Sequence, residues 1–90
     1  MKYIIVRIYE FGGNDRVVDH VAVVFPEQIP QLSHKDVARL HSASLRAVVS
    51  AGFCEIDWDT KTVSVNGISD TLKMASRSED APIIAKLFGW

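Results

Sequence analysis

Hydrophobic and polar positions alternate at the start of the chain. Between residues 2 and 9, Ile4, Val6 and Ile8 form a wholly apolar face, and the residues between them form a mixed one. Alternation of period two with β-branched residues predicts a strand. Residues 17–25 predict a second strand, and its two largely apolar faces indicate a central place in a sheet. Glycine, asparagine and aspartate within residues 11–16 are turn formers, so the two strands form a hairpin.

Capping residues predict where the first helix begins. Two prolines between residues 26 and 30 break the strand pattern. Ser33 is followed three residues later by Asp36, which is the spacing of a capping box. The helix therefore begins near His34.

The end of this helix has two interpretations. In the favoured one it ends near Ala43, and residues 45–57 form a long strand, because the Val48-Val49 pair is typical of strands. In the alternative, helical spacing continues through residues 44–51 to Gly52, which then follows the last helical turn. The two interpretations place the same segment in different layers of the fold.

Three short alternating runs follow, at residues 53–58, 61–65 and 68–74, and they indicate a meander. A turn at Asp59-Thr60 places Cys54 opposite Val65, and Ile56 opposite Val63, with all four side chains on one face. The opposite face then carries Phe53, Glu55 and Asp57 of the first run, opposite Asn66, Ser64 and Thr62.

A second turn is predicted at Asn66-Gly67, because this dipeptide favours a type I′ hairpin. The resulting register puts Ile68, Leu72 and Met74 on the same face as the two valines of the preceding run. It also points Asp70 toward that apolar face, where an unpaired carboxylate is costly. Asp70 therefore lies at an exposed margin, or a bulge shifts the register.

The C-terminal segment predicts a second helix. Ser78 or Asp80 caps it, Pro82 fits its first turn, and Gly89 ends it. Its apolar residues recur at helical spacing and predict a buried stripe made of Ile83, Ile84, Leu87 and Phe88.

The order of elements is therefore β-β-α-β-β-β-α. Ninety residues suffice for a single domain, over residues 1–90. The expected class is α+β: a two-layer fold with a mainly antiparallel sheet of about five strands and two helices on one face.

Charge and cysteine content narrow the functional classes. The net charge is −1, which provides no general basic footprint for nucleic acid. A single cysteine forms no internal disulfide, which favours a reducing compartment. The apolar run from Tyr3 to Val6 is shorter than the roughly 7–15 residues of a signal-peptide core, and no run approaches the roughly 18 residues of a membrane span. We expect a soluble cytoplasmic protein.

Cys54 is the first candidate for chemistry. A nucleophilic cysteine needs cationic neighbours or a helix N-terminus to lower its pKa, but the charged residues nearest in sequence are acidic. The strand pattern also places Cys54 on an apolar face. We therefore predict a core residue and no catalytic residue. A small thiol-dependent or hydrolytic enzyme centred on Cys54 is the alternative.

No metal or cofactor site is predicted. His34 and His41 are seven residues apart, and His20 lies within a strand, so no two histidines have the spacing of a helical metal pair. Glu55 and Asp57 fall on the solvent side of their strand, where carboxylates are simply hydrated. No motif for a bound cofactor occurs.

A basic region offers a second alternative. Lys35, Arg39 and Arg46 lie within or just after the first helix and could contact phosphates. No aromatic residues are interleaved with them for stacking on bases. A weak nucleic-acid-binding module is therefore the less favoured interpretation of these residues.

Three segments in the second half resemble a known group of proteins: SAGFCEID at 50–57, VNGISDTLKM at 65–74 and SRSEDAPIIAKL at 76–87. In this order they are similar to small uncharacterised proteins encoded by tailed phages and prophages. Ser78 stands where those proteins usually have proline, and Thr71-Leu72 replaces a Ser-Leu pair. The resemblance implies a phage or prophage origin and a strand at residues 46–57. It implies no activity and assigns no functional residue.

The leading functional hypothesis is a non-enzymatic, phage-type interaction protein that binds a protein partner in the bacterial cytoplasm. The expected contact is the polar sheet face with Phe53, Glu55 and Asp57, or an edge strand. Trp58 at the turn and Trp90 are the expected anchors, because tryptophan is enriched at binding hot spots. Alternatively, Trp90 packs over the end of the sheet. Exposed edges would also permit a homodimer.

Overall fold

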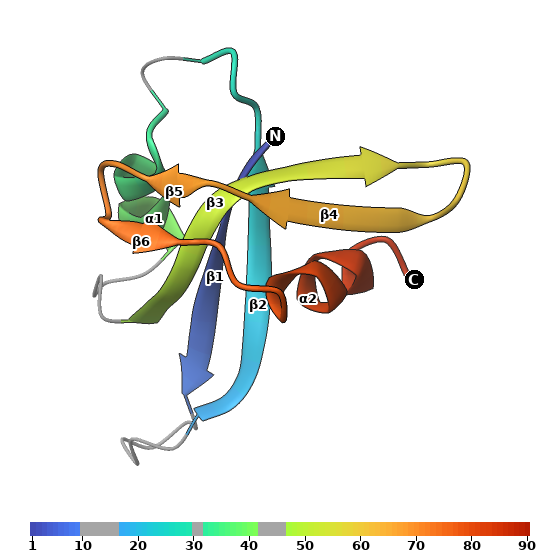
Figure 1. Cartoon of the computed structure of the whole chain (residues 1–90). Helices are drawn as coiled ribbons and strands as arrows, with labels where there is room; N and C mark the ends of the chain where they lie inside the picture. Colours follow the sequence, from blue (N-terminus) through green and yellow to red (C-terminus); the bar gives the residue numbers. More distant parts are fainter. Residues whose placement is uncertain (10–16, 30–31, 42–46) are drawn as a thin grey trace.

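A computed structural model describes residues 1–9, 17–29, 32–41 and 47–90, and these form a four-stranded antiparallel sheet, a two-stranded sheet and two helices (Figure 1). The four-stranded sheet consists of β1 (Lys2–Tyr9), β2 (Val17–Phe25), β3 (Val48–Asp57) and β4 (Thr62–Asn66), in the spatial order β2-β1-β3-β4. The other elements are α1 (His34–His41), β5 (Ile68–Ser69), β6 (Met74–Ala75) and α2 (Asp80–Lys86). The α+β class is confirmed. The turn predicted within residues 11–16 lies outside the described residues.

The two helices cover opposite faces of the four-stranded sheet. Ile4 and Val6 of β1 pack in a cluster that includes α1, whereas Tyr3 and Ile5 pack in a second cluster that includes α2. Successive strand residues point to opposite faces, so the helices lie on different sides. The predicted two-layer fold with both helices on one face is therefore wrong. We refer to the two sides as the α1 face and the α2 face.

Burial on both sides also explains the position of β2, which is predicted to be central but forms one edge of the sheet. Val23 and Phe25 belong to the cluster on the α1 face, and Ala22 and Val24 to the cluster on the α2 face. A strand between two helical layers is apolar on both faces even at an edge. The two apolar faces of β2 therefore indicate that both sides of the sheet are covered, and they do not indicate a central position.

The local start of α1 follows the sequence closely. The Asp36 backbone N–H donates to Ser33 Oγ over 3.1 Å, and the Ser33 N–H donates to Asp36 Oδ2 over 3.1 Å, which confirms the capping box. Because β3 begins at Val48, the favoured short-helix interpretation is confirmed. The predicted helix end near Ala43 lies outside the described residues.

The chain leaves the four-stranded sheet at Gly67. Gly67 has a φ of +85°, but Asn66 has no positive φ, so the predicted type I′ hairpin does not form. A Cβ on Gly67 would lie 2.7 Å from a ring carbon of Phe53, so only glycine fits there. The next strand, β5, pairs with β6 and not with β4.

The β5–β6 hairpin therefore covers the α1 face. Leu72 and Met74 pack against the cluster that includes α1, and not with Val63 and Val65 as predicted. Asp70, which the expected register pointed inward, is exposed at the turn of this hairpin. A separate two-stranded sheet thus replaces the predicted fifth strand, and it removes the buried carboxylate that made the prediction awkward.

The second helix is capped differently from the prediction. Glu79 occupies the N-cap position and makes no side-chain capping bond, and Ser78 is exposed. Ile84 is fully buried, and Ile83 and Phe88 pack beside it, but Leu87 of the predicted stripe is 48% exposed. Gly89, with a φ of +76°, follows the helix as expected. Neither α1 nor α2, the helices of the described residues, has the length and apolar character needed to cross a membrane.

Candidate functional site

The most prominent surface feature is a hairpin that extends past the rest of the sheet. β1 begins beside Cys54, where Met1 and Cys54 exchange two backbone hydrogen bonds of 2.7 and 3.0 Å. Beyond this point β3 pairs only with β4 (Figure 1). We refer to residues 55–65 as the β3–β4 ribbon. A ribbon of two strands has two accessible faces and two free edges.

The register within this hairpin is the predicted one. Cys54 pairs with Val65, and Ile56 with Val63. The turn is longer than predicted, because residues 58–61 lie between the strands and Lys61 adopts a φ of +55°. Asp57 Oδ1 accepts the backbone N–H groups of Asp59 and Thr60 over 3.0 and 3.1 Å. These bonds, with the Thr60 bond the largest cause, hold the pKa of Asp57 below its usual value.

The α2 face of the ribbon is apolar and packs against the C-terminal segment. Val63 and Val65 pack in the same cluster as Phe88. The Trp58 ring contacts Phe88 and Trp90 edge-to-face, with ring centroids 4.9 and 5.3 Å apart. The C-terminal segment thus packs against the tip of the ribbon, as the alternative interpretation of Trp90 expects. Trp58 nevertheless remains 61% exposed.

The opposite face of the ribbon is polar and hollowed. A depression of about 640 Å³ is lined by Trp58 together with carboxylate, hydroxyl and aliphatic side chains from both strands and the turn: Glu55, Ile56, Asp57, Asp59, Thr62 and Ser64. We refer to it as the ribbon hollow. Within the described part of the chain, none of its three carboxylates forms an ion pair. No group of three described His, Cys, Asp or Glu side chains could hold a metal ion. The hollow presents negative charge that suits a cationic ligand.

Phe53, predicted to belong to the contact surface, packs with its ring against α1. It is half-buried, with its ring 5.5 Å from that of His34. His34 is itself buried between Phe53 and Phe25, and its Nε2 lies 2.8 Å from the Gly52 carbonyl oxygen. Burial lowers the pKa of His34, so the ring is held neutral at neutral pH. Phe53 and His34 therefore fix α1 to β3.

Cys54 is a core residue. Its side chain is 1% exposed and belongs to the cluster that contains Tyr3 and Ile84. Burial raises the pKa of the thiol, which keeps it protonated. A small depression of about 280 Å³ adjoins Cys54, but no histidine lines it. Among the described residues around this sulfur, no histidine is placed to act as its base.

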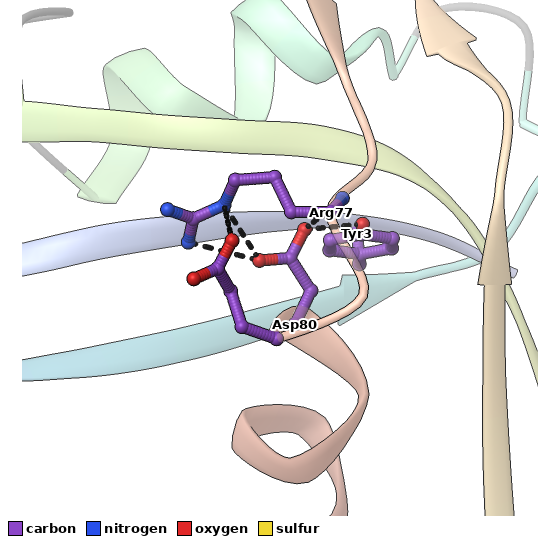
Figure 2. A network of polar contacts seen from close by, with 4 residues as sticks. Tyr3, Arg77 and Asp80 are labelled. Atoms are coloured by element: carbon purple, nitrogen blue, oxygen red, sulfur yellow. Dashed lines mark hydrogen bonds and ion pairs between the residues drawn. The ribbon is translucent and has the colours of Figure 1, made fainter.

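A buried polar network holds α2 to the sheet, and sequence reasoning missed it. Figure 2 shows the Tyr3 hydroxyl and the Arg77 guanidinium converging on the Asp80 carboxylate. Tyr3 donates to Asp80 Oδ2 over 2.6 Å, and Arg77 donates through Nε and Nη2 to Oδ1 over 3.1 and 2.9 Å. The Arg77 backbone N–H donates to Oδ2 over 2.9 Å. The Asp80 carboxylate thus accepts these four hydrogen bonds and joins β1 to the start of α2.

The network keeps its charge despite its burial. Burial alone would raise the pKa of Asp80, but the hydrogen bonds from Tyr3 and Arg77 outweigh it and hold the pKa below its usual value. Burial and the neighbouring carboxylate raise the pKa of Tyr3. The hydroxyl of Ser50 is also buried and likewise acts to lower the Asp80 pKa, although it makes no hydrogen bond of regular geometry to the described residues. Because Asp80 and Tyr3 are fully buried, their hydrogen bond fixes the start of α2 to β1. The Arg77–Asp80 spacing was visible in the sequence, but Tyr3 lies 77 residues away.

The basic region is only partly described. Lys35 and Arg39 lie one helical turn apart on α1, and the acidic Asp36 lies between them in the chain. The Lys35 backbone N–H donates to Thr71 Oγ1 over 3.2 Å, which brings the β5–β6 turn and its exposed Asp70 next to this helix. Arg46 lies outside the described residues. Acidic residues thus accompany the described basic ones.

Comparison of the chain with protein-family models, with curated proteins and with solved structures finds no match. The resemblance to tailed-phage proteins therefore stays a prediction. Function has to be argued from the geometry of the ribbon.

Proposed function

We propose that this protein is a non-enzymatic interaction protein that binds a protein partner through the β3–β4 ribbon. The observation that carries the proposal is Trp58, which is 61% exposed at the tip of the ribbon and lines the ribbon hollow beside carboxylates that form no ion pair with the described residues. A large aromatic side chain beside polar groups is the usual composition of a binding hot spot and its rim.

The support beneath Trp58 favours binding over simple exposure. Phe88 and Trp90 contact the ring from the α2 face, so the indole is held in place before a partner arrives. An anchor that is already ordered loses less conformational entropy on binding than a free side chain does. The ribbon thus presents a preorganised aromatic group on a projecting element.

The proposed setting is the bacterial cytoplasm, with the protein acting as a phage or prophage product on a host or phage protein. The sequence resemblance supports this origin, and the single, buried, unpaired Cys54 is compatible with a reducing compartment. The exposed edges of β2 and β4 also support self-association, so a second copy of the chain is one partner that the test must detect.

The test compares partner capture by wild type and Trp58→Ala. Ile68→Ala is the matched control, because Ile68 is 60% exposed but lies on β5, outside the ribbon. We expect bacterial lysate, with and without induced prophage, to yield a protein that wild type and Ile68→Ala retain and Trp58→Ala loses. Light scattering of the purified protein detects self-association. Identical captured proteins for all three forms, with unchanged oligomeric state, would contradict the proposal.

A further inference from the structure

The direction of the backbone groups shows which edge of the ribbon is not paired with another described strand. Cys54 exchanges its N–H and C=O bonds with Met1, so the backbone groups of Cys54 point toward β1. Backbone groups alternate in direction along a strand, so those of Glu55 and Asp57 point toward β4. Their partners Ser64 and Thr62 then bond back to β3.

The intervening residues of β4 therefore point their backbone groups outward. Val63 and Val65 each present one N–H and one C=O along an edge that no described strand covers. On the other edge of the ribbon, only Ile56 is free in this way, and Met1 lies beside it. The β4 edge thus offers four correctly spaced hydrogen-bonding groups, which is the requirement for adding a strand.

The two faces beside this edge differ in charge. On the α2 face, the side chains of Val63 and Val65 continue the apolar cluster. On the opposite face, the short Thr62 and Ser64 side chains lie between the edge and the carboxylates of Asp57 and Glu55. An added strand would lie about 10 Å from β3, which is two strand spacings. Long lysine or arginine side chains can reach over the two hydroxyl residues, whereas short ones cannot.

We propose that the β4 edge binds an extended cationic segment of a partner protein as a fifth strand of the sheet, with alternate Lys or Arg side chains over Thr62 and Ser64. The inference rests on the proposed function and names the partner chemistry of the same ribbon. Backbone hydrogen bonds supply the affinity, and the charges select the partner, because exposed ion pairs are individually weak. Asp57 and its ordered turn keep one carboxylate fixed beside the hollow.

The probe is the peptide Lys-Val-Lys-Val-Lys-Val-Lys, whose alternation puts all cations on one face. We expect NMR shift changes and slowed amide exchange at Val63 and Val65, whose N–H groups become bonded. A peptide of the same composition without alternation, and one with glutamate for lysine, should bind at least about tenfold more weakly. Equal binding of either control, or unchanged Val63 and Val65 amides at about 1 mM alternating peptide, would overturn the inference.

Two variants separate the backbone from the side chain. Val63→Pro removes an outward N–H and leaves the β3–β4 ladder intact, since proline is tolerated on that side of an edge strand. Val63→Ala keeps the N–H and removes part of the side chain. We expect about a tenfold loss of peptide affinity for Val63→Pro and less than about threefold for Val63→Ala. Circular dichroism verifies that both fold, and equal affinities of the two folded variants contradict strand addition.

The charge is tested by Glu55→Gln, with Glu79→Gln as the control on α2. We expect Glu55→Gln, but not Glu79→Gln, to lower the affinity for the lysine peptide and to reduce the salt dependence of its binding. The inference and the proposed function fail separately: a natural partner lost by Trp58→Ala but kept by Val63→Pro refutes strand addition and leaves the ribbon as the binding element. A partner kept by both variants refutes both.

Discussion

Two carboxylates in this protein occupy opposite situations. Asp80 is fully buried at the start of α2 and accepts hydrogen bonds from Tyr3 and from the side chain and backbone of Arg77. Glu55 is exposed on the ribbon and forms no ion pair with the described residues. Complete internal pairing indicates a carboxylate that stabilises the fold, whereas an exposed one beside an open edge remains available to a ligand.

The aromatic residues beside these two carboxylates repeat the difference. Tyr3 is wholly buried, and its hydroxyl is satisfied by Asp80. Trp58 contacts the C-terminal segment edge-to-face and keeps most of its surface in water. The junction of β1 with α2 therefore contributes to stability, and the ribbon is the proposed recognition element. Substitutions in the two regions should accordingly change different measurements.

The largest effect is expected at the buried network. Asp80→Ala leaves the Tyr3 hydroxyl and the Arg77 donors without their acceptor, and should lower the free energy of unfolding by about 3 kcal/mol. This is the lower end for a broken buried pair, because the Arg77 side chain is 34% exposed and rehydrates. Urea unfolding measures the change. Glu79→Gln, which affects only the exposed 3.7 Å contact with Arg77, should change stability by less than about 0.5 kcal/mol.

The next effect expected is a loss of stability in acid, caused by the buried His34. Its folded pKa lies below the unfolded value of about 6.5, so the unfolded chain binds the additional proton between these values. The free energy of unfolding therefore falls as the pH drops below about 6.5 and levels off below the folded pKa. Lys2 and Asp70 act on the ring in opposite directions. Urea midpoints between pH 7.5 and 4.5 test this.

The control for the acid experiment is a second histidine. His34→Gln should reduce the dependence of the free energy of unfolding on pH in that window. His20→Gln, at a half-exposed position of β2, should keep the dependence of the wild type. Loss of the slope in both variants would assign the effect to something other than burial of His34.

A smaller effect on stability is expected at the tip of the ribbon. Trp58→Ala removes two edge-to-face contacts and should destabilise the fold by about 1 kcal/mol. Thermal unfolding followed by circular dichroism measures it. A loss as large as that of Asp80→Ala would mean that Trp58 is a core residue and would weaken the contrast between the regions.

The smallest stability effect is expected for Glu55→Gln. The side chain is exposed and has no ion pair in the described part of the chain, so the urea midpoint should correspond to a change within about 0.5 kcal/mol. The same variant should weaken binding of the lysine peptide. A variant that changed stability and not binding would reverse the roles assigned to the two carboxylates.

Local patterns predicted those parts of the fold that depend on neighbouring residues. The capping box at Ser33 and Asp36 needs only a separation of three residues, and the β3–β4 register needs only alternation and a short turn. The resulting contacts of Cys54 with Val65 were therefore predictable. The acidic face of the ribbon was predictable for the same reason, although its hollow and its open edge were not.

The Asn66-Gly67 dipeptide shows where local reasoning fails. Asn66 pairs with Phe53 at the end of β4, and the Phe53 ring lies against Gly67. Gly67 then directs the chain onto the α1 face, where its carbonyl oxygen accepts the Ser76 N–H over 3.0 Å. The dipeptide predicts a hairpin because glycine readily adopts a positive φ. Gly67 does adopt one, but its contact with the Phe53 ring of β3 accompanies a change of chain direction and not a hairpin.

The sequence by itself determined the first four strands, the start of α1, the register of β3 with β4 and the burial of Cys54, because each depends on periodicity or on groups a few residues apart. Only the tertiary structure decided that the helices lie on opposite faces, that β5 leaves the sheet and that Tyr3 meets Asp80. Alternation assigns residues to two faces of a strand, but it does not say which layer covers each face when both are apolar. That assignment depends on contacts between segments distant in the chain.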